Sequence, residues 1–105
     1  MAKVSLSARA RRDLLSLLAD LADVAGTQTA RKYDTKFKRV IRRLARFPGI
    51  GAPRPQLGAE TRLVSVNPYL IFYDGGPKSG TVHVLRILHG RRNITPGLVA
   101  RGREP

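Results

Sequence analysis

Arg62, Arg86 and His89 are the residues of this sequence that could together act on a phosphodiester. A guanidinium stabilises charge that develops on a phosphate, and a neutral imidazole accepts a proton. Arg86 lies inside an apolar stretch, where an unpaired charge would be unfavourable, so it either faces a groove beside Arg62 or pairs with a carboxylate. The carboxylates considered are Glu60 and Asp74. Two arginines follow His89 and favour its neutral form, although a structural, hydrogen-bonding histidine is the alternative.

Other catalytic or metal-binding motifs are missing from the sequence. It contains no GK[ST] phosphate loop, no H-E-x-x-H and no G-x-S-x-G, and without cysteine it has no disulfide or thiolate ligand. His83 and His89 lie six residues apart, about 20 Å along a strand, so they cannot share a metal ion. Asp13, Asp20 and Asp23 share one predicted helix and are expected to be solvated carboxylates facing arginines. We therefore expect neither a metal nor another cofactor.

Positive charge is the dominant feature of the composition. The 105 residues include 20 basic and 7 acidic side chains, a formal net charge of +13, with the excess in both halves of the sequence. Such a charge indicates a polyanionic partner, either nucleic acid or an acidic protein segment, whereas a merely solvated basic surface is the alternative. The arginines expected to contact a partner are Arg39, Arg42, Arg43, Arg46, Arg54, Arg91 and Arg92.

The elements that must position these residues begin with a strand and a helix. Val4 and Leu6 alternate with polar residues, which predicts a short strand. Ser7 can cap the following helix by accepting from a backbone N–H two or three residues later. Apolar residues then recur at steps of three and four from Ala10 to Val24, which is one helical face. Gly26 is expected to end this helix.

A second helix follows after only a few residues. Thr27 or Thr29 is expected to cap it, and the apolar stripe runs from Ala30 to Phe47 before Pro48 stops it. Because the connection is short, the two helices should form an antiparallel hairpin. The solvent face of the second helix holds eight basic residues.

Strands occupy the second half of the chain. Residues 48–58 are expected to be an irregular loop because they hold three prolines and three glycines. Strand patterns follow at residues 62–66, 69–73 and 81–89, and the last is apolar on both faces, which favours an interior position in the sheet. Tyr69 and Tyr73 share one face of their strand, and that face should belong to the core rather than to a base-stacking platform.

The predicted order is therefore β-α-α-β-β-β. The fold class is α+β with two layers, in which the helical hairpin packs on an antiparallel sheet and the first strand lies along one edge. Residues 1–94 should form a single domain, followed by a basic, partly flexible tail over residues 95–105. No apolar segment follows Lys3, and Leu14–Ala25 is too short and too charged to cross a bilayer, so we expect a soluble cytoplasmic protein.

Four segments follow one another in an informative order: V-S-L-S-x-x-A-x-x-D-L at 4–14, R-F-P-G-I-G at 46–51, R-L-V-S-V-N-P-Y-L-I-F-Y at 62–73 and V-L-R-I-L-H-G-R-R-N-I at 84–94. Together they resemble the ParE/RelE superfamily of bacterial toxins from type II toxin–antitoxin modules, over about residues 3–94. The fold that this resemblance implies agrees with the predicted order of elements.

The resemblance implies one of two activities. RelE-like toxins cut mRNA in the ribosomal A site with Lys, Arg and often a C-terminal Tyr or His, whereas ParE-like toxins inhibit DNA gyrase and are not nucleases. Arg62 and Arg86 resemble the sheet arginines of the RelE-like set, and His89 keeps the nuclease interpretation open. No Tyr follows Tyr73, however, and residues 48–60 contain no Lys. The sequence is therefore interpreted as nearer to ParE, with an mRNA endonuclease as the alternative.

Either activity implies partners. The resemblance implies a cognate antitoxin whose acidic C-terminal segment folds on this basic surface, a toxin–antitoxin hetero-oligomer, and DNA gyrase or the ribosome as target. A basic nucleic-acid-binding domain without toxicity is the remaining alternative. These expectations assume that the two helices pack on one side of the sheet and leave an accessible arginine-lined surface. Separated helices, or Arg86 locked inside with a permanent counter-ion and no accessible groove, would remove the basis for the toxin interpretation.

Overall fold

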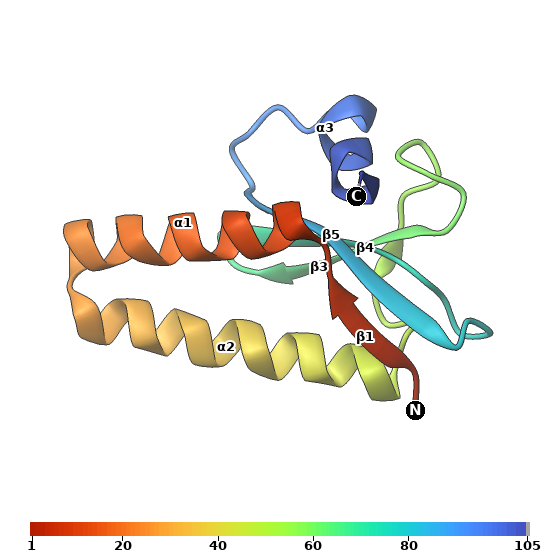
Figure 1. Ribbon diagram of the computed structural model, residues 1–105, viewed down its shortest axis with the longest axis horizontal. Helices are drawn as coiled ribbons and strands as arrows, with labels where there is room; N and C mark the ends of the chain where they lie inside the picture. Colours follow the sequence, from red (N-terminus) through yellow and green to blue (C-terminus); the bar gives the residue numbers. More distant parts are fainter. Residues whose placement is uncertain (105) are drawn as a thin grey trace.

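The computed structural model describes residues 1–104. Two long helices lie side by side and cover one face of a five-stranded sheet, while short C-terminal helical turns cover part of the other face (Figure 1). The elements are β1 (Lys3–Leu6), α1 (Ala8–Ala25), α2 (Thr27–Arg46), β2 (Ala52–Pro53), β3 (Thr61–Val66), β4 (Tyr69–Asp74), β5 (Thr81–His89), α3 (Pro96–Ala100) and η1 (Arg101–Arg103).

The sheet has the strand order β1-β5-β4-β3-β2. Strands β3, β4 and β5 form the predicted antiparallel meander, and β1 lies along one edge, parallel to β5. β5 has neighbours on both sides and is buried on both faces, which confirms the interior position that its apolar sequence predicted. β2 was not predicted: within the expected loop, two residues pair with β3 and form the other edge.

The helical hairpin begins as its sequence predicts. Ser7 caps α1, and its hydroxyl accepts from the backbone N–H of Ala10 at 2.9 Å. The prediction that Thr27 or Thr29 caps α2 is wrong, because Gly26 alone separates the helices and Thr27 already belongs to α2. Gly26 has a φ of 93°, a value that favours glycine, so one residue reverses the chain direction.

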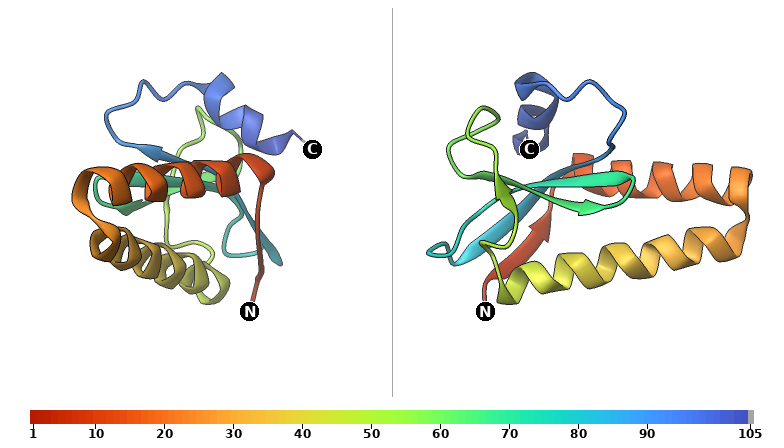
Figure 2. Two further views of the ribbon diagram at one scale, coloured as in Figure 1. Left: turned by 60° about the vertical axis from the view of Figure 1, so that its left-hand side comes forward. Right: turned by 180° about the vertical axis from the view of Figure 1, so that it is seen from behind.

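The face of the sheet beneath the helices holds the larger core. Phe37 and Leu44 of α2 are fully buried there against Ile71 and Tyr73 of β4. Tyr69 and Tyr73 lie in this core at 9% and 0% exposure, which confirms the expected face of β4. The tip of the hairpin extends past the sheet (Figure 2), and Val24 there is 88% exposed although the helical periodicity placed it on the buried stripe.

The opposite face of the sheet carries a second, smaller core that the two-layer prediction did not include. Val99 of α3 is fully buried among Phe72, Leu85 and Leu88. Gly102 of η1 lies so close to β5 that a Cβ on it would be 2.3 Å from the carbonyl oxygen of Leu85. Within the predicted tail over residues 95–105, α3 and η1 thus form helical turns that pack on the sheet, while Pro105 lies outside the described residues.

A side-chain network fastens η1 to the sheet. Arg103 Nε donates to Asp74 Oδ2 at 2.7 Å, and its Nη2 donates to Thr61 Oγ1 at 2.7 Å. Burial alone would raise the pKa of the Asp74 carboxyl, but the hydrogen bonds from Arg103 and Thr61 outweigh burial and hold it below its ordinary value of 3.8. The ionised form of Asp74 therefore stabilises the folded chain.

We expect this network to make stability depend on acid pH. Because the pKa of Asp74 is lower in the folded than in the unfolded chain, its contribution is complete above the unfolded value of 3.8 and is lost as the pH falls through the lower folded value. The free energy of unfolding, measured with urea between about pH 6 and about pH 2.5, should decline more for the natural chain than for Asp74→Asn. Parallel curves for the two chains would contradict this role.

Candidate functional site

The guanidinium of Arg86 is enclosed by the fold and bound on three sides. Arg86 is 5% exposed, and its Nε donates to Asp13 Oδ2 at 2.7 Å while its Nη2 donates to Asp13 Oδ1 at 3.0 Å. Its Nη1 donates to the carbonyl oxygen of Leu98 at 2.9 Å. The prediction that Glu60 or Asp74 pairs with Arg86 is therefore wrong, because the partner is Asp13, a carboxylate of α1. A paired arginine fork of this kind is not available to bind phosphate.

Asp13 reaches Arg86 because of the way in which α1 leaves the sheet. β1 covers only the first four residues of β5, so the outer edge of β5 is open beyond Val84. Side chains from the following helix complete this edge: the Ser7 hydroxyl donates to the Leu85 carbonyl oxygen at 2.8 Å, and Asp13 Oδ2 accepts from the Ile87 N–H at 3.0 Å. The Asp13 carboxylate therefore neutralises the buried charge of Arg86 and also accepts a hydrogen bond from a backbone N–H at the open edge of β5.

Arg62 shapes a turn rather than a catalytic cluster. Its Nη1 donates to the carbonyl oxygens of Gly49 and Gly51, at 3.0 and 2.8 Å. The Tyr73 hydroxyl holds the same turn, since it donates to the Pro48 carbonyl oxygen at 2.7 Å and accepts from the Gly51 N–H at 2.9 Å. Burial raises the pKa of Tyr73, although the Gly51 hydrogen bond and the Arg62 charge oppose that rise. The hydroxyl therefore remains a proton donor to Pro48.

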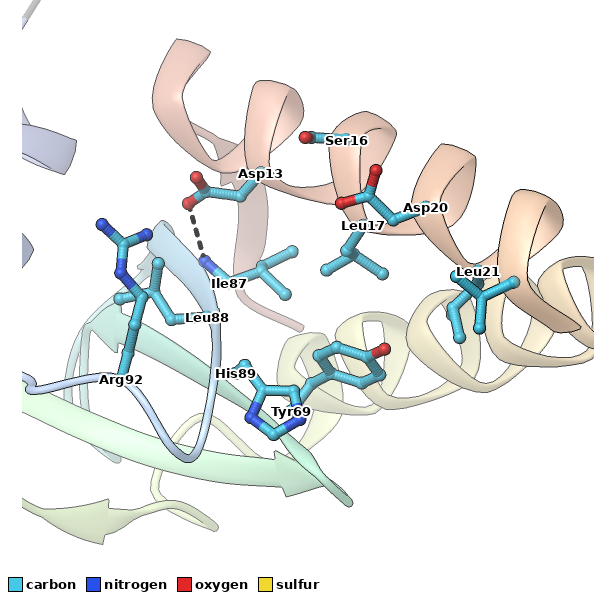
Figure 3. Close-up of a pocket in the computed structure, with 11 residues that line it drawn as sticks. Asp13, Ser16, Leu17, Asp20, Leu21, Tyr69, Ile87, Leu88, His89 and Arg92 are labelled. Carbon is cyan, nitrogen blue, oxygen red and sulfur yellow. Dashed lines mark hydrogen bonds between the residues drawn. The ribbon is translucent and has the colours of Figure 1, made fainter.

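His89 lies at a cleft between α1 and the ends of β4 and β5 (Figure 3). Its Nδ1 accepts from the Arg91 N–H at 3.0 Å, and its ring meets Tyr69 edge to face with centroids 5.5 Å apart. Burial, then Tyr33 and Asp20, raise the pKa of Tyr69. The lining of this cleft, about 430 Å³ in volume, is Asp13, Ser16, Leu17, Asp20, Leu21, Val24, Tyr69, Ile87, Leu88, His89 and Arg92.

The structure therefore does not assemble the catalytic set that the sequence suggested. Arg86 is paired with Asp13, and Arg62 is bound to the turn at Gly49–Gly51. His89 lies apart from both contacts, in the cleft beside α1. Figure 3 shows Asp13 and Asp20 projecting from α1 toward the cleft that holds His89. Because Asp13 is neutralised by Arg86, the remaining charges of the lining are Asp20 and Arg92, which offset each other and leave no excess positive charge to hold a polyanionic strand. The structural interpretation of His89 is the one that these contacts support.

The arginines proposed for partner binding are placed differently. Arg39, Arg42, Arg43 and Arg46 are exposed on α2, Arg54 is half-buried, and Arg91 and Arg92 are exposed after β5. Within residues 1–104 the ion pairs involve Lys38 with Asp34, Arg86 with Asp13, and Arg103 with Asp74. These four arginines of α2 thus face solvent without a carboxylate partner among residues 1–104, so an accessible cationic surface remains on α2 although Arg86 is buried with a counter-ion.

Two features of the site were missed from the sequence. Asp13 was placed on the solvent face of its helix, and only the parallel pairing of β1 with β5 brings it to Arg86. The periodicity placed Phe47 on the apolar stripe of the second helix and Ile50 in an irregular loop, but Phe47 follows the end of α2 and both side chains are exposed. The prolines and glycines that flank Ile50 are the signal that could have drawn attention to a constrained, outward-facing turn.

Among residues 1–104, no group of three or more His, Cys, Asp or Glu side chains is arranged to hold a metal ion. No helix in that range combines the length and the apolar character that crossing a membrane requires.

Comparison with known proteins identifies relatives along most of the chain. The family model described as the ParE toxin of type II toxin-antitoxin system, parDE, matches residues 4–94. Toxin ParE3 of Caulobacter vibrioides is 31% identical over 86 residues, covering 82% of this chain and 84% of that protein. Toxin ParE1 of the same organism is 30% identical over 88 residues, covering 84% of this chain and 88% of that protein.

A solved structure described as the chromosomal ParDE TA system from P. aeruginosa has a similar fold. Its TM-score is 0.69 at 20% identity, and the match covers 85% of this chain and 96% of that one. The two-helix layer on a sheet is thus shared with a protein of quite different sequence.

We expect removal of Asp13 to be severely destabilising. Asp13→Ala leaves a buried guanidinium without its counter-ion and the Ile87 N–H without an acceptor, which should lower the free energy of unfolding by about 3–5 kcal/mol. Urea denaturation at neutral pH measures this difference. Asp34→Ala is the matched control: its pair with Lys38 is exposed, so the loss should stay below about 1 kcal/mol. Equal losses for the two variants would contradict the structural role of Asp13.

Proposed function

Because this chain belongs to the ParE family of toxins from type II toxin–antitoxin systems, we propose that it inhibits DNA gyrase and that a cognate antitoxin neutralises it. The observation that carries the choice of target is the buried pair between Arg86 and Asp13. It occupies the one guanidinium of β5 that a nuclease of this superfamily would need free. An inhibitor of gyrase acts in the cytoplasm, which is the location we propose.

The alternative of a ribosome-dependent mRNA endonuclease rests on Arg62, Arg86 and His89. Cleavage by the RNA 2′-OH requires a group that accepts its proton and cations that stabilise the charge developing on the phosphate, all within contact of one nucleotide. Here the two arginines donate to Asp13 and to the backbone of Gly49 and Gly51 instead. These contacts favour a toxin that acts by binding rather than by cleavage.

An antitoxin fits the unpaired charge on the surface. The segment that forms α2 contains eight basic residues and one acidic residue, and its arginines lack carboxylate partners within residues 1–104. An acidic segment that orders itself on this helix would neutralise the charge and find the toxin quickly through electrostatic attraction. We propose a toxin–antitoxin hetero-oligomer in which such a segment, at the C-terminal end of the antitoxin, lies against the toxin.

We expect purified chain to inhibit DNA supercoiling by gyrase and to leave translated mRNA uncut. The supercoiling assay is run with the full chain and bacterial gyrase, and primer extension on an mRNA in a translation reaction detects A-site cleavage. The antitoxin from the reading frame that adjoins or overlaps this gene should restore supercoiling when it is added in equal amount.

A control separates inhibition from general effects of a basic protein on DNA. Raising the salt concentration should weaken nonspecific DNA binding steeply, by a slope of about −0.9 per phosphate contact on a log–log plot, while inhibition of gyrase should persist. Unimpaired gyrase together with A-site cuts in the mRNA would replace the proposed activity by the endonuclease. Strong DNA binding without growth arrest on expression would instead support a non-toxic nucleic-acid-binding domain.

A further inference from the structure

Two large apolar side chains are exposed together at the end of α2. Phe47, which follows the helix, is 52% exposed, and Ile50 in the next turn is 47% exposed. They line a hollow of about 500 Å³ together with Arg43, Arg46, Pro48, Gly49 and Pro77. We call this region the Phe47–Ile50 surface. Its centre is apolar and its rim is cationic, an arrangement typical of protein–protein interfaces.

A second hollow continues the Phe47–Ile50 surface along the sheet. It has a volume of about 390 Å³ and shares Arg43 and Ile50 with the first. Its other lining residues come from α2 and from the edge formed by β2 and β3: Val40, Leu44, Ala52, Leu63, Val64 and Ser65. Arg43 and Ile50 line both hollows, one of which reaches Pro77 and the other Ser65; we call the two hollows together the groove.

The turn that presents Ile50 is held rigid from the inside. Its carbonyl oxygens at Pro48, Gly49 and Gly51 accept from the side chains of Tyr73 and Arg62, with distances of 2.7–3.0 Å. A Cβ at Gly51 would lie 2.6 Å from the Tyr73 hydroxyl, so this position admits only glycine without movement. Binding to such a preformed surface requires less ordering of the protein than binding to a mobile loop.

Charge indicates what kind of partner fits the groove. Arg43 and Arg46 border the apolar centre, Arg39 precedes Arg43 by about one helical turn, and all three are exposed. A DNA or RNA backbone would satisfy the arginines but would leave Phe47 and Ile50 facing phosphates, because a phosphate backbone offers little apolar surface. A protein segment with acidic residues beside bulky apolar residues satisfies both features.

We propose that the Phe47–Ile50 surface is a docking site for an acidic amphipathic segment of the antitoxin, an inference that rests on the proposed neutralisation by a cognate antitoxin. Apolar side chains of the segment fill the two hollows against Phe47 and Ile50, and its carboxylates pair with Arg43 and Arg46. Tyr73 and Arg62 act as positioning residues, since they hold the turn without reaching the partner.

The test measures binding between the full-length toxin and the antitoxin from the adjoining reading frame. Phe47→Ser and Ile50→Ser should each weaken the affinity by about ten-fold or more, as loss of a central apolar anchor does. Leu15→Ser and Val24→Ser are the matched controls, because Leu15 and Val24 are also exposed apolar residues, at 70% and 88%, but lie outside the groove. These controls should leave the affinity unchanged.

A charge reversal separates the cationic rim from the total charge. Arg46→Glu should mainly lower the association rate and the affinity, whereas Arg12→Glu on α1 makes the same change in net charge outside the groove. A smaller effect of Arg12→Glu is expected. Equal effects of the two reversals would show that only the net charge matters and would overturn the assignment of the rim.

A photo-crosslinking residue at position 50 gives a readout that does not depend on the stability of the serine variants. Irradiation of the complex should attach position 50 to an acidic segment of the antitoxin, identified by mass spectrometry, and position 15 should not react. Crosslinks only from position 15, or full affinity for both serine variants, would overturn this surface while leaving neutralisation intact. Absence of any antitoxin binding would instead contradict the proposed neutralisation.

The same variants distinguish a surface for the target from one for the inhibitor. If Phe47→Ser and Ile50→Ser abolish inhibition of gyrase in the supercoiling assay but bind the antitoxin as the natural chain does, the groove belongs to the target and the proposal is wrong. If they bind a DNA duplex more weakly and the antitoxin equally well, the groove is a nucleic-acid site and the proposal is equally wrong.

Discussion

The buried pair between Arg86 and Asp13 is the contact on which the rest of the structure depends. A guanidinium inside an apolar strand is stable only if its donors are satisfied, and here α1 supplies a carboxylate and α3 a carbonyl oxygen at Leu98. The same carboxylate accepts from the Ile87 N–H, where β5 extends beyond its partner β1. One ion pair thus joins the helical hairpin, the sheet and the C-terminal turns, and it fixes where α1 crosses the sheet edge.

Local patterns were sufficient to predict the helical hairpin, the meander and the Ser7 cap, because each depends on residues close in sequence. The periodicity failed at Val24, where the sheet ends before the helix does. It also gave no sign of the Asp13 contact, since 73 residues separate the partners and the contact requires β1 to lie parallel to β5. The turns after residue 95 are too short for periodicity, and the close fit of Gly102 against Leu85 is visible only in three dimensions.

The candidate catalytic residues were also affected by contacts between residues that are far apart in the sequence. Arg62 and Arg86 were identified as cations in a sheet, which is correct, but the sequence does not reveal what occupies a guanidinium. In the folded chain one holds a carboxylate and the other holds two carbonyl oxygens. A shared fold does not by itself place a catalytic group, because an ion pair or a turn can occupy the donors that a catalytic site needs.

The remaining charge sets how this toxin can meet an inhibitor. Exposed ion pairs contribute at most about 1 kcal/mol each, so a formal charge of +13 accelerates encounter far more than it tightens a complex. Tight binding requires apolar side chains that are removed from water when the partner binds, on a surface that is already formed before binding. Phe47 and Ile50 meet that requirement because Arg62 and Tyr73 hold their turn from beneath. On the proposed docking surface, the arginine that the sequence suggested for catalysis serves recognition instead, because Arg62 holds the turn that presents Ile50 beside the exposed arginines of α2.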